Sequence, residues 1–305
     1  MISFTRHRNK SFLLSALLVA VSLLSLALNG FNLGIDFAGG TIFQLNFREQ
    51  FTLEEVEEVL EKEGLSGAAL QLVQGRDPGG EAAGEGVVIK TSYLDEEERR
   101  KVIAAFRERF PSLGAGDVRV ESVGAVVGRE MVQQALFALA VAVVLMVAYI
   151  AFRFEFKFSL ATILVLLHDI IVVAGVFSLL RLEVNSTFVA AILTVFGYSV
   201  NNTIVIIDRI RENLRHKRPE EYAGVVDLSI SQSLVRCLNT SLTTLLVLVA
   251  LFVGFYYFIG SFDLIAFVIA IIIGVAVGTY SSIFVASPLW FTFKEWEFRR
   301  RGKAA

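Results

Sequence analysis

The sequence predicts an all-α membrane protein with six transmembrane helices and one small α+β domain inserted outside the membrane. Hydrophobic residues make up 55% of the 305 residues and charged residues only 19%, a composition too apolar for an ordinary soluble fold of this length. Six segments are apolar over the ~20 residues that a helix needs to cross a bilayer core. One long polar segment, residues 31–130, follows the first of them.

The six predicted transmembrane helices cover residues 11–30, 131–152, 158–180, 184–207, 236–260 and 264–290. Only the third is interrupted by ionisable residues, which are His168 and Asp169. The first follows a basic start and could instead be a cleavable secretory signal. Its apolar run from Phe12 to Leu28 is longer than the ~7–15 residues of a usual signal core, and five further spans follow. We therefore predict that it anchors the chain in the membrane.

The positive charges predict which way the helices run, because short loops rich in Lys and Arg stay on the cytoplasmic side. Such residues gather at 1–10, 153–157, 208–235 and 291–305, and 208–235 is expected to be a loop with an amphipathic helix. Residues 31–130 hold 11 Lys and Arg against 19 Asp and Glu, a net charge of −8. Both termini are therefore predicted to be cytoplasmic and residues 31–130 exoplasmic, or periplasmic.

The polar segment alternates strand and helix signals. Strands are expected at residues 41–47, 70–73, 87–91 and 118–123. Thr52 with Glu55, and Asp95 with Glu98, match the capping box that begins a helix, so helices are expected to about residues 63 and 110. The order βαββαβ is that of a ferredoxin-like domain. Gly39-Gly40 before the first strand is expected to bend the backbone, because glycine reaches positive φ without steric cost.

Catalytic and metal-ligating groups are sparse in the sequence. The single cysteine, Cys237, permits no internal disulfide, and the three histidines are scattered, so no usual metal-ligand spacing is present. The net charge of −2 implies no basic surface for nucleic acid. The polar segment shows no nucleophile with a base and no phosphate-binding glycine loop. We expect no catalytic residues, no metal site and no bound cofactor.

The interrupted third span provides the first candidate for function. His168 and Asp169 lie about 11 residues into it, which is ~16 Å along a helix and near the middle of a bilayer. Ionisable groups at that depth are costly unless they face the interior of a helix bundle, so they are candidates for a proton or ion pathway. The alternative is a buried pair that only links helices by hydrogen bonds.

Two polar stripes add further candidates for that pathway. The fourth span carries Thr194, Tyr198, Asn201 and Asn202, of which the first three follow one side of a helix. The fifth begins with Arg236 and carries Thr240, Thr243 and Thr244 on one face. If these two faces meet, an internal hydrophilic path for a proton or an ion results.

Two other groups of residues are expected to be structural. The sixth span repeats small residues every four positions, at Ala270, Gly274, Gly278 and Ser282, which allows close helix packing. The charged residues just past the fourth span are expected to form a solvated, ion-paired helix end.

Several motifs resemble the SecD/SecF family of export membrane proteins. The run from Gly34 to Gly40 resembles its D-F-x-G-G signature through Asp36, Phe37, Gly39 and Gly40. The pair His168-Asp169 and the run from Gly197 to Thr203 resemble the SecF branch in particular. A third SecF-like run supplies Asp208, Arg209, Arg211 and Glu212. The resemblance extends over essentially the whole chain.

The resemblance implies half of an RND-type transporter architecture in the bacterial inner membrane, driven by the proton motive force and not by a bound cofactor. It implies SecD as an obligate partner and the SecYEG channel as another, with YajC and YidC as further associates. The implied substrate is an unfolded preprotein, which the exoplasmic domains help to pull outward after ATP-driven insertion. Membrane lipid surrounds the helices, and neither nucleic acid nor an enzymatic reaction is implied.

One position departs from the family pattern. In similar SecF proteins the run in span four ends Asn-Asp, whereas here it reads Asn201-Asn202. The resemblance therefore places the family's proton-carrying aspartate at Asn202 and its partner arginine at Arg236, with which Asn202 can hydrogen-bond but to which it offers no charge. An amide cannot bind and release a proton near neutral pH. Either the chain is an engineered or arrested variant, or another carboxylate such as Asp169 or one in SecD carries the proton.

Two other functions are compatible with a six-helix membrane protein. An RND-type transporter of small molecules or lipids would need a large exoplasmic pocket domain, and roughly 80 residues are too few to enclose one. A passive scaffold of a membrane complex would tolerate apolar substitutions at Asp169, Asn202 and Arg236, whereas a motor would not.

Overall fold

The computed structural model describes residues 3–47, 49–76, 82–215, 217, 218, 221–259 and 261–302. The chain divides into two compact units. The first, here called the helical unit, comprises Met1–Asn32, Phe137–Phe252 and Ala266–Ala305. The second, here called the inserted unit, comprises Leu33–Leu136 and Val253–Ile265.

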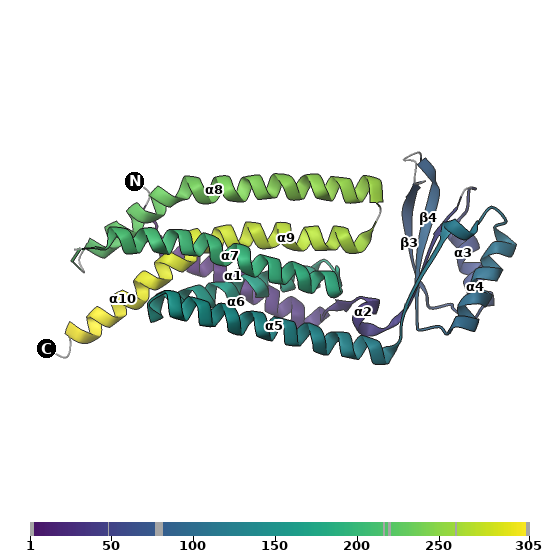
Figure 1. The fold of residues 1–305 in the computed structure, drawn as a ribbon, viewed down its shortest axis with the longest axis horizontal. Coiled ribbons are helices and arrows are strands. Elements are labelled where there is room, and N and C mark those ends of the chain that lie inside the picture. The colour runs from purple at the N-terminus through teal and green to yellow at the C-terminus, as the bar shows by residue number, and fades with distance from the viewer. Residues whose placement is uncertain are drawn as a thin grey trace. The chain divides into compact units, whose positions relative to one another are not determined.

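Helices dominate the structure (Figure 1). They are α1 (Arg8–Asn29), α5 (Ala125–Arg153), α6 (Phe156–Leu179), α7 (Ser186–Asn213), α8 (Tyr222–Gly254), α9 (Phe262–Ser281) and α10 (Ser287–Gly302). Five-residue π-helical segments follow α8 and α9, namely η3 (Phe255–Ile259) and η4 (Ser282–Ala286). Six helices among the described residues are long and apolar enough to cross a membrane, as the sequence predicts. Two short strands, β1 (Asn32–Leu33) and β6 (Glu183–Val184), complete the elements outside the sheet described below.

Helices α7 and α8 occupy much of residues 208–235, which were expected to form a cytoplasmic loop with an amphipathic helix. Helix α7 continues to Asn213, and α8 already begins at Tyr222, before the predicted start at residue 236. A helix does not end where its apolar run ends, because polar residues satisfy the same backbone hydrogen bonds once the helix has formed. The connection between the two helices is therefore much shorter than the sequence suggests.

Helices α6 and α7 form the centre of the helical unit. Just over half of the span of each is buried, against 6% for α5 and 11% for α8. Helix α1 packs along α6 so closely that a Cβ added at Gly175 would overlap Ser22. Near this contact Ser25 donates a hydrogen bond of 3.1 Å to Ser178. Small residues thus bring the two helices together, which is how helices associate in lipid.

The inserted unit contains a four-stranded sheet and the helices connected to it. Its elements are α2 (Ile35–Ala38), β2 (Gly40–Asn46), α3 (Leu53–Lys62), β3 (Ala69–Arg76), β4 (Ala82–Thr91), α4 (Glu96–Arg109), a 3₁₀ turn η1 (Ala115–Asp117) and β5 (Val118–Val123). The strand order is β3-β4-β2-β5, and all neighbouring strands are antiparallel. Strands β3 and β4 extend beyond the predicted 70–73 and 87–91, because backbone pairing continues past the apolar residues that reveal a strand in sequence.

Aromatic and aliphatic side chains fill the core of this unit. Phe43 of β2, Leu60 of α3 and Phe106 of α4 are almost completely buried there. Both predicted capping boxes are confirmed. The Thr52 hydroxyl accepts a bond from the Glu55 amide, and the Glu55 carboxylate accepts one from the Thr52 amide. Asp95 and Glu98 do the same at the start of α4.

The two consecutive glycines at the start of β2 are required by the backbone. Gly39 has a φ of +76° and Gly40 a φ of +147°. A Cβ at Gly40 would lie 2.8 Å from the carbonyl oxygen of Thr91, and one at Gly39 would lie 3.2 Å from that of Val123. The expected bend is therefore present, and a side chain at either position would be both strained and crowded.

Candidate functional site

Asp169 is the most completely buried ionisable residue among the sites that the sequence predicts. It lies in α6 with no exposed surface. One carboxylate oxygen, Oδ1, is 2.9 Å from Nδ1 of His168, and the other, Oδ2, accepts bonds from two serine hydroxyls. These are Ser199 of α7, at 2.5 Å, and Ser281 at the end of α9, at 2.9 Å. We call these four residues the Asp169 cluster, and through it groups from three helices meet at one carboxylate.

The next residue after Ser281 also bonds to α7, and it lies in the π-helical segment η4. Its first residue, Ser282, is as buried as Ser281. Ser282 shares a hydrogen bond of 2.9 Å with Thr203 of α7 and donates one of 3.3 Å to the carbonyl oxygen of Ser199. A π-helical turn holds one residue more than an α-helical turn, so it changes which side chains face the neighbouring helix. Both consecutive serines therefore form bonds inside the unit.

Close packing of α9 on α7 makes these bonds possible. A Cβ added at Gly274 would overlap Val195, and one at Gly278 would lie 3.2 Å from the Cβ of Ser199. The small-residue repeat thus packs as the sequence predicts. Its last member, Ser282, does more than pack, because its hydroxyl joins α9 to α7.

Asn202 and Arg236 are not brought together. Asn202 lies in α7 and is 2% exposed, and its amide nitrogen has no hydrogen-bond partner among the described residues. Arg236 lies on the exposed side of α8, where no described residue forms an ion pair with it. Among the described residues, the structure contains no hydrogen bond between the two. A neutral amide lacks the charge that would hold a guanidinium group inside a helix bundle.

The two polar stripes meet at only one residue of the predicted set. Tyr198 donates a hydrogen bond of 2.7 Å to Ser241 of α8, which in turn shares one of 2.7 Å with Thr279 of α9. Thr240 is exposed, and Thr244 donates to the carbonyl oxygen of Thr240 in the same helix. Threonine can satisfy its hydroxyl on its own helix, so a threonine stripe needs no partner helix.

Asn201 lies on the surface of α7, beside a shallow apolar pocket that it lines with Gly197 and Tyr149. It forms no part of the Asp169 cluster. The charged end of α7 forms the expected ion pairs: Asp208 with Arg211 at 3.4 Å, and Arg209 with Glu212 at 2.6 Å. Exposed pairs of this kind contribute little stability.

The part of the chain that the structure describes contains no group of three or more His, Cys, Asp or Glu side chains placed to hold a metal ion. Carboxylate, imidazole and hydroxyl groups are therefore what the buried site offers. They can bind, hold and exchange a proton.

Comparison with known proteins identifies the family. A family described as "Protein export membrane protein SecD/SecF, C-terminal" matches residues 103–296, and one described as "SecD/SecF GG Motif" matches residues 24–50. The chain belongs to the SecD/SecF family. The second match includes Gly39 and Gly40, so the resemblance inferred from that motif is confirmed.

The SecF relatives within this family are similar along nearly their whole length. The chain is 36% identical over 297 residues to "Protein translocase subunit SecF" of Sebaldella termitidis, covering 97% of this chain and 93% of that protein. It is 40% identical to the SecF of Acidaminococcus fermentans, covering 96% and 97%. The crystal structure of SecDF from Thermus thermophilus, described as a translocon-associated membrane protein, matches with a TM-score of 0.81 and 36% identity. That match covers 96% of this chain but only 39% of the SecDF chain.

Sequence reasoning did not identify the serines and threonines that form the buried hydrogen bonds between helices. They are Ser199, Thr203, Ser241, Thr279, Ser281 and Ser282. The consecutive serines Ser281 and Ser282 in an otherwise apolar span were the available signal. The neighbouring helix to which each hydroxyl donates cannot be inferred from spacing along one helix.

Proposed function

We propose that this chain is the SecF subunit of a bacterial export motor that uses the proton motive force to draw unfolded preproteins across the inner membrane. The names of the relatives support a role in protein translocation, as a transport component and not as a catalyst. The single observation that carries the proposal is the buried Asp169 carboxylate, which accepts hydrogen bonds from both α7 and α9.

Protonation of Asp169 would change how three helices are held. The ionised carboxylate accepts bonds from Ser199 and Ser281 at one oxygen and faces His168 with the other. A protonated carboxyl group carries a hydrogen on one oxygen, which then donates and no longer accepts in the same way. A proton on Oδ2 would force one serine hydroxyl to turn away, whereas a proton on Oδ1 would donate to Nδ1 of His168 and change the tautomer of that ring. Arrival of a proton is thereby coupled to the packing of α6 against α7 and α9, the kind of two-state contact that a motor needs.

The proposal includes the orientation and the partners. Both termini are cytoplasmic and residues 31–130 are exoplasmic, which the distribution of Lys and Arg supports. The inserted unit is a ferredoxin-like domain, supported by its βαββαβ order and its strand order β3-β4-β2-β5. SecD supplies the other half of an RND-type assembly, in keeping with the longer SecDF relatives, and the complex acts beside the SecYEG channel.

The test compares proton-dependent export by matched variants. The chain is reconstituted with SecD and SecYEG in vesicles, and export after ATP-driven insertion is measured with and without an imposed proton gradient. Asp169→Asn is expected to abolish the gradient-dependent part, because an amide cannot exchange the proton. Asn202→Asp is expected to raise it, since a second buried titratable group is added to the helical unit.

Asn201→Asp is the control, because it adds the same charge one position away on the exposed side of α7. It is expected to leave export unchanged. Equal gradient-dependent export by the chain and Asp169→Asn would defeat the role of Asp169. Equal export by the chain and Asn202→Asp would defeat the effect assigned to Asn202. A passive scaffold would give the same export with every variant.

A further inference from the structure

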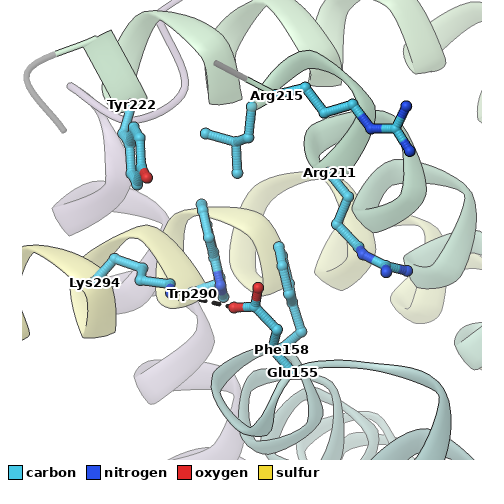
Figure 2. A pocket seen from close by; sticks show the side chains of 8 residues that line it. Glu155, Phe158, Arg211, Arg215, Tyr222, Trp290 and Lys294 are labelled. Atoms are coloured by element: carbon cyan, nitrogen blue, oxygen red, sulfur yellow. Dashed lines mark hydrogen bonds and ion pairs between the residues drawn. The ribbon is translucent and has the colours of Figure 1, made fainter. Parts of the chain in front are cut away.

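A second polar site lies outside the Asp169 cluster, in a pocket of about 250 Å³ (Figure 2). Its lining comes from the start of α6, the end of α7 and the residues just beyond it, the start of α8, and α10. Aromatic rings form part of the wall. The rings of Phe158 and Trp290 stack with centroids 4.4 Å apart, and Tyr222 lies 6.4 Å from Trp290.

The pocket carries a surplus of positive charge. Three cations and one carboxylate line it, and the carboxylate of Glu155 is paired with Lys294 at 3.2 Å. Arg211 is paired with Asp208 at 3.4 Å on the exposed surface, and its guanidinium carbon lies 5.8 Å from the centre of the Phe154 ring. Arg215 forms no ion pair with any residue that the structure describes. The Arg215 guanidinium is therefore available to an anion, and Arg211 keeps N–H donors beyond the one that faces Asp208.

Trp290 adds a hydrogen-bond donor that lacks an acceptor. Its side chain is 1% exposed, and the indole nitrogen Nε1 has no partner among the described residues. A buried donor left unpaired costs free energy, and such groups usually have a water, ion or ligand as partner. The donor and the cations thus offer the same kind of interaction, with a negatively charged oxygen.

Figure 2 shows how the side chains are arranged around the pocket. Tyr222 and Lys294 lie on one side, Arg211 and Arg215 lie on the other, and Trp290 stands between them. The ends of both arginines extend away from Trp290, so their aliphatic parts line the pocket while the charged groups stand at its rim. Long arginine side chains can rotate about their stems, and they can therefore close over a bound anion.

We propose that this pocket binds the phosphate group of an anionic ligand, supplied by a phospholipid headgroup or by free phosphate. Arginine is suited to phosphate because its planar group donates two parallel hydrogen bonds. The volume is below that of a site for a drug-sized molecule, which fits a headgroup-sized anion. Tryptophan and tyrosine beside basic residues are typical of the membrane surface, where such headgroups lie. The proposal does not depend on the export function.

Binding can be measured directly through Trp290. The chain has two tryptophans, so Trp296→Phe leaves Trp290 as the only one. The purified full-length variant in detergent is titrated with dioctanoyl phosphatidylglycerol, with dioctanoyl phosphatidylcholine and with inorganic phosphate. Phosphatidylglycerol is expected to change Trp290 fluorescence in a saturable way, and phosphatidylcholine is not. A response to phosphate alone would assign the site to the free anion, and a response to phosphatidylglycerol alone would assign it to the lipid.

Arginine variants decide whether the pocket is responsible. Arg211→Gln and Arg215→Gln are each expected to weaken binding about ten-fold, the value of one charge-assisted hydrogen bond. Arg218→Gln is the control, because it removes the same charge from the same connection without lining the pocket. An unchanged thermal unfolding midpoint without ligand shows that the variants are folded. Equal responses to both lipids, or equal binding by the double arginine variant and the control, would overturn the proposal.

Discussion

The inserted unit and the helical unit place polar and apolar side chains in opposite ways. In the inserted unit, Phe43 and Phe106 are fully buried and the charged residues of α3 and α4 lie on the surface. In the helical unit, Phe152 is 95% exposed, while Asp169 and Ser281 are fully buried. Burial of apolar surface favours folding in water, whereas lipid solvates that surface equally well. Specific structure in the membrane must therefore come from hydrogen bonds and small-residue packing.

The largest effect is expected from an aromatic residue in the inserted unit. Phe106→Ala should destabilise that unit by about 3–5 kcal/mol, because it leaves a cavity in a closely packed core. Hydrogen exchange of the strands β2 and β4 in the full chain measures the loss. Phe152→Ala removes the same atoms from the exposed side of α5 and should cost almost nothing. Similar losses for both would show that the two units do not differ in what holds them together.

A smaller effect is expected where helices pack through small residues. Gly175→Ala should destabilise the helical unit by about 1–3 kcal/mol, because the added Cβ would overlap Ser22 and force α1 away from α6. Gly197→Ala is the matched control, since no atom lies within 4 Å of the position its Cβ would occupy. Alanine also favours the helix at both sites, so the control should be neutral or more stable. Thermal unfolding of the purified chain measures both, and equal midpoints would contradict the packing argument.

A single buried hydroxyl is expected to matter less than either. Ser281→Ala removes one donor to Asp169 and should cost about 0.6–1.7 kcal/mol, the range for hydrogen bonds between membrane helices. Thr243→Val, on the exposed side of α8, removes a hydroxyl that bonds only to its own helix. That control should leave the unfolding midpoint unchanged. If Thr243→Val lost as much stability as Ser281→Ala, the hydroxyl groups would stabilise their own helices and not the contacts between helices.

The same contrast explains which parts of the structure could be predicted from sequence. In the inserted unit, Thr52 and Asp95 mark the starts of α3 and α4 because a capping box is a local signal, with both partners three residues apart. The spans of the helical unit could likewise be counted from length and hydropathy. Both kinds of signal are contained in a single segment of chain.

The contacts of Asp169 could not be predicted in the same way. Its burial follows from the cost of a charge in lipid, but its partners Ser199 and Ser281 lie 30 and 112 residues away. Ser281 reaches it where α9 gives way to a π-helical segment, and no residue pattern announces that change. The family pattern built on an aspartate could not predict the surroundings of Asn202 either, since an amide attracts no guanidinium group by charge.

The smallest effect is expected from Glu58, an exposed carboxylate of the inserted unit that contrasts with the buried Asp169 of the helical unit. The Lys62 ammonium, which donates a hydrogen bond of 2.9 Å to Glu58, holds the pKa of the Glu58 carboxyl below its usual value. A lowered pKa means that the ionised form stabilises the fold above the pKa of the unfolded chain, and that this stabilisation is lost as pH falls through the folded value. Because the pair is exposed, salt screens it and the effect is small. At pH 7 and low salt, the amides of α3 should therefore exchange slightly more slowly in the chain than in Glu58→Gln. This difference between the two proteins should disappear below pH 4, or when salt is added. If the exchange rates of the chain and Glu58→Gln still differed at low pH, Glu58 would act through packing and not through its charge. Its role would then resemble that of the buried Asp169 more closely than its exposed position suggests.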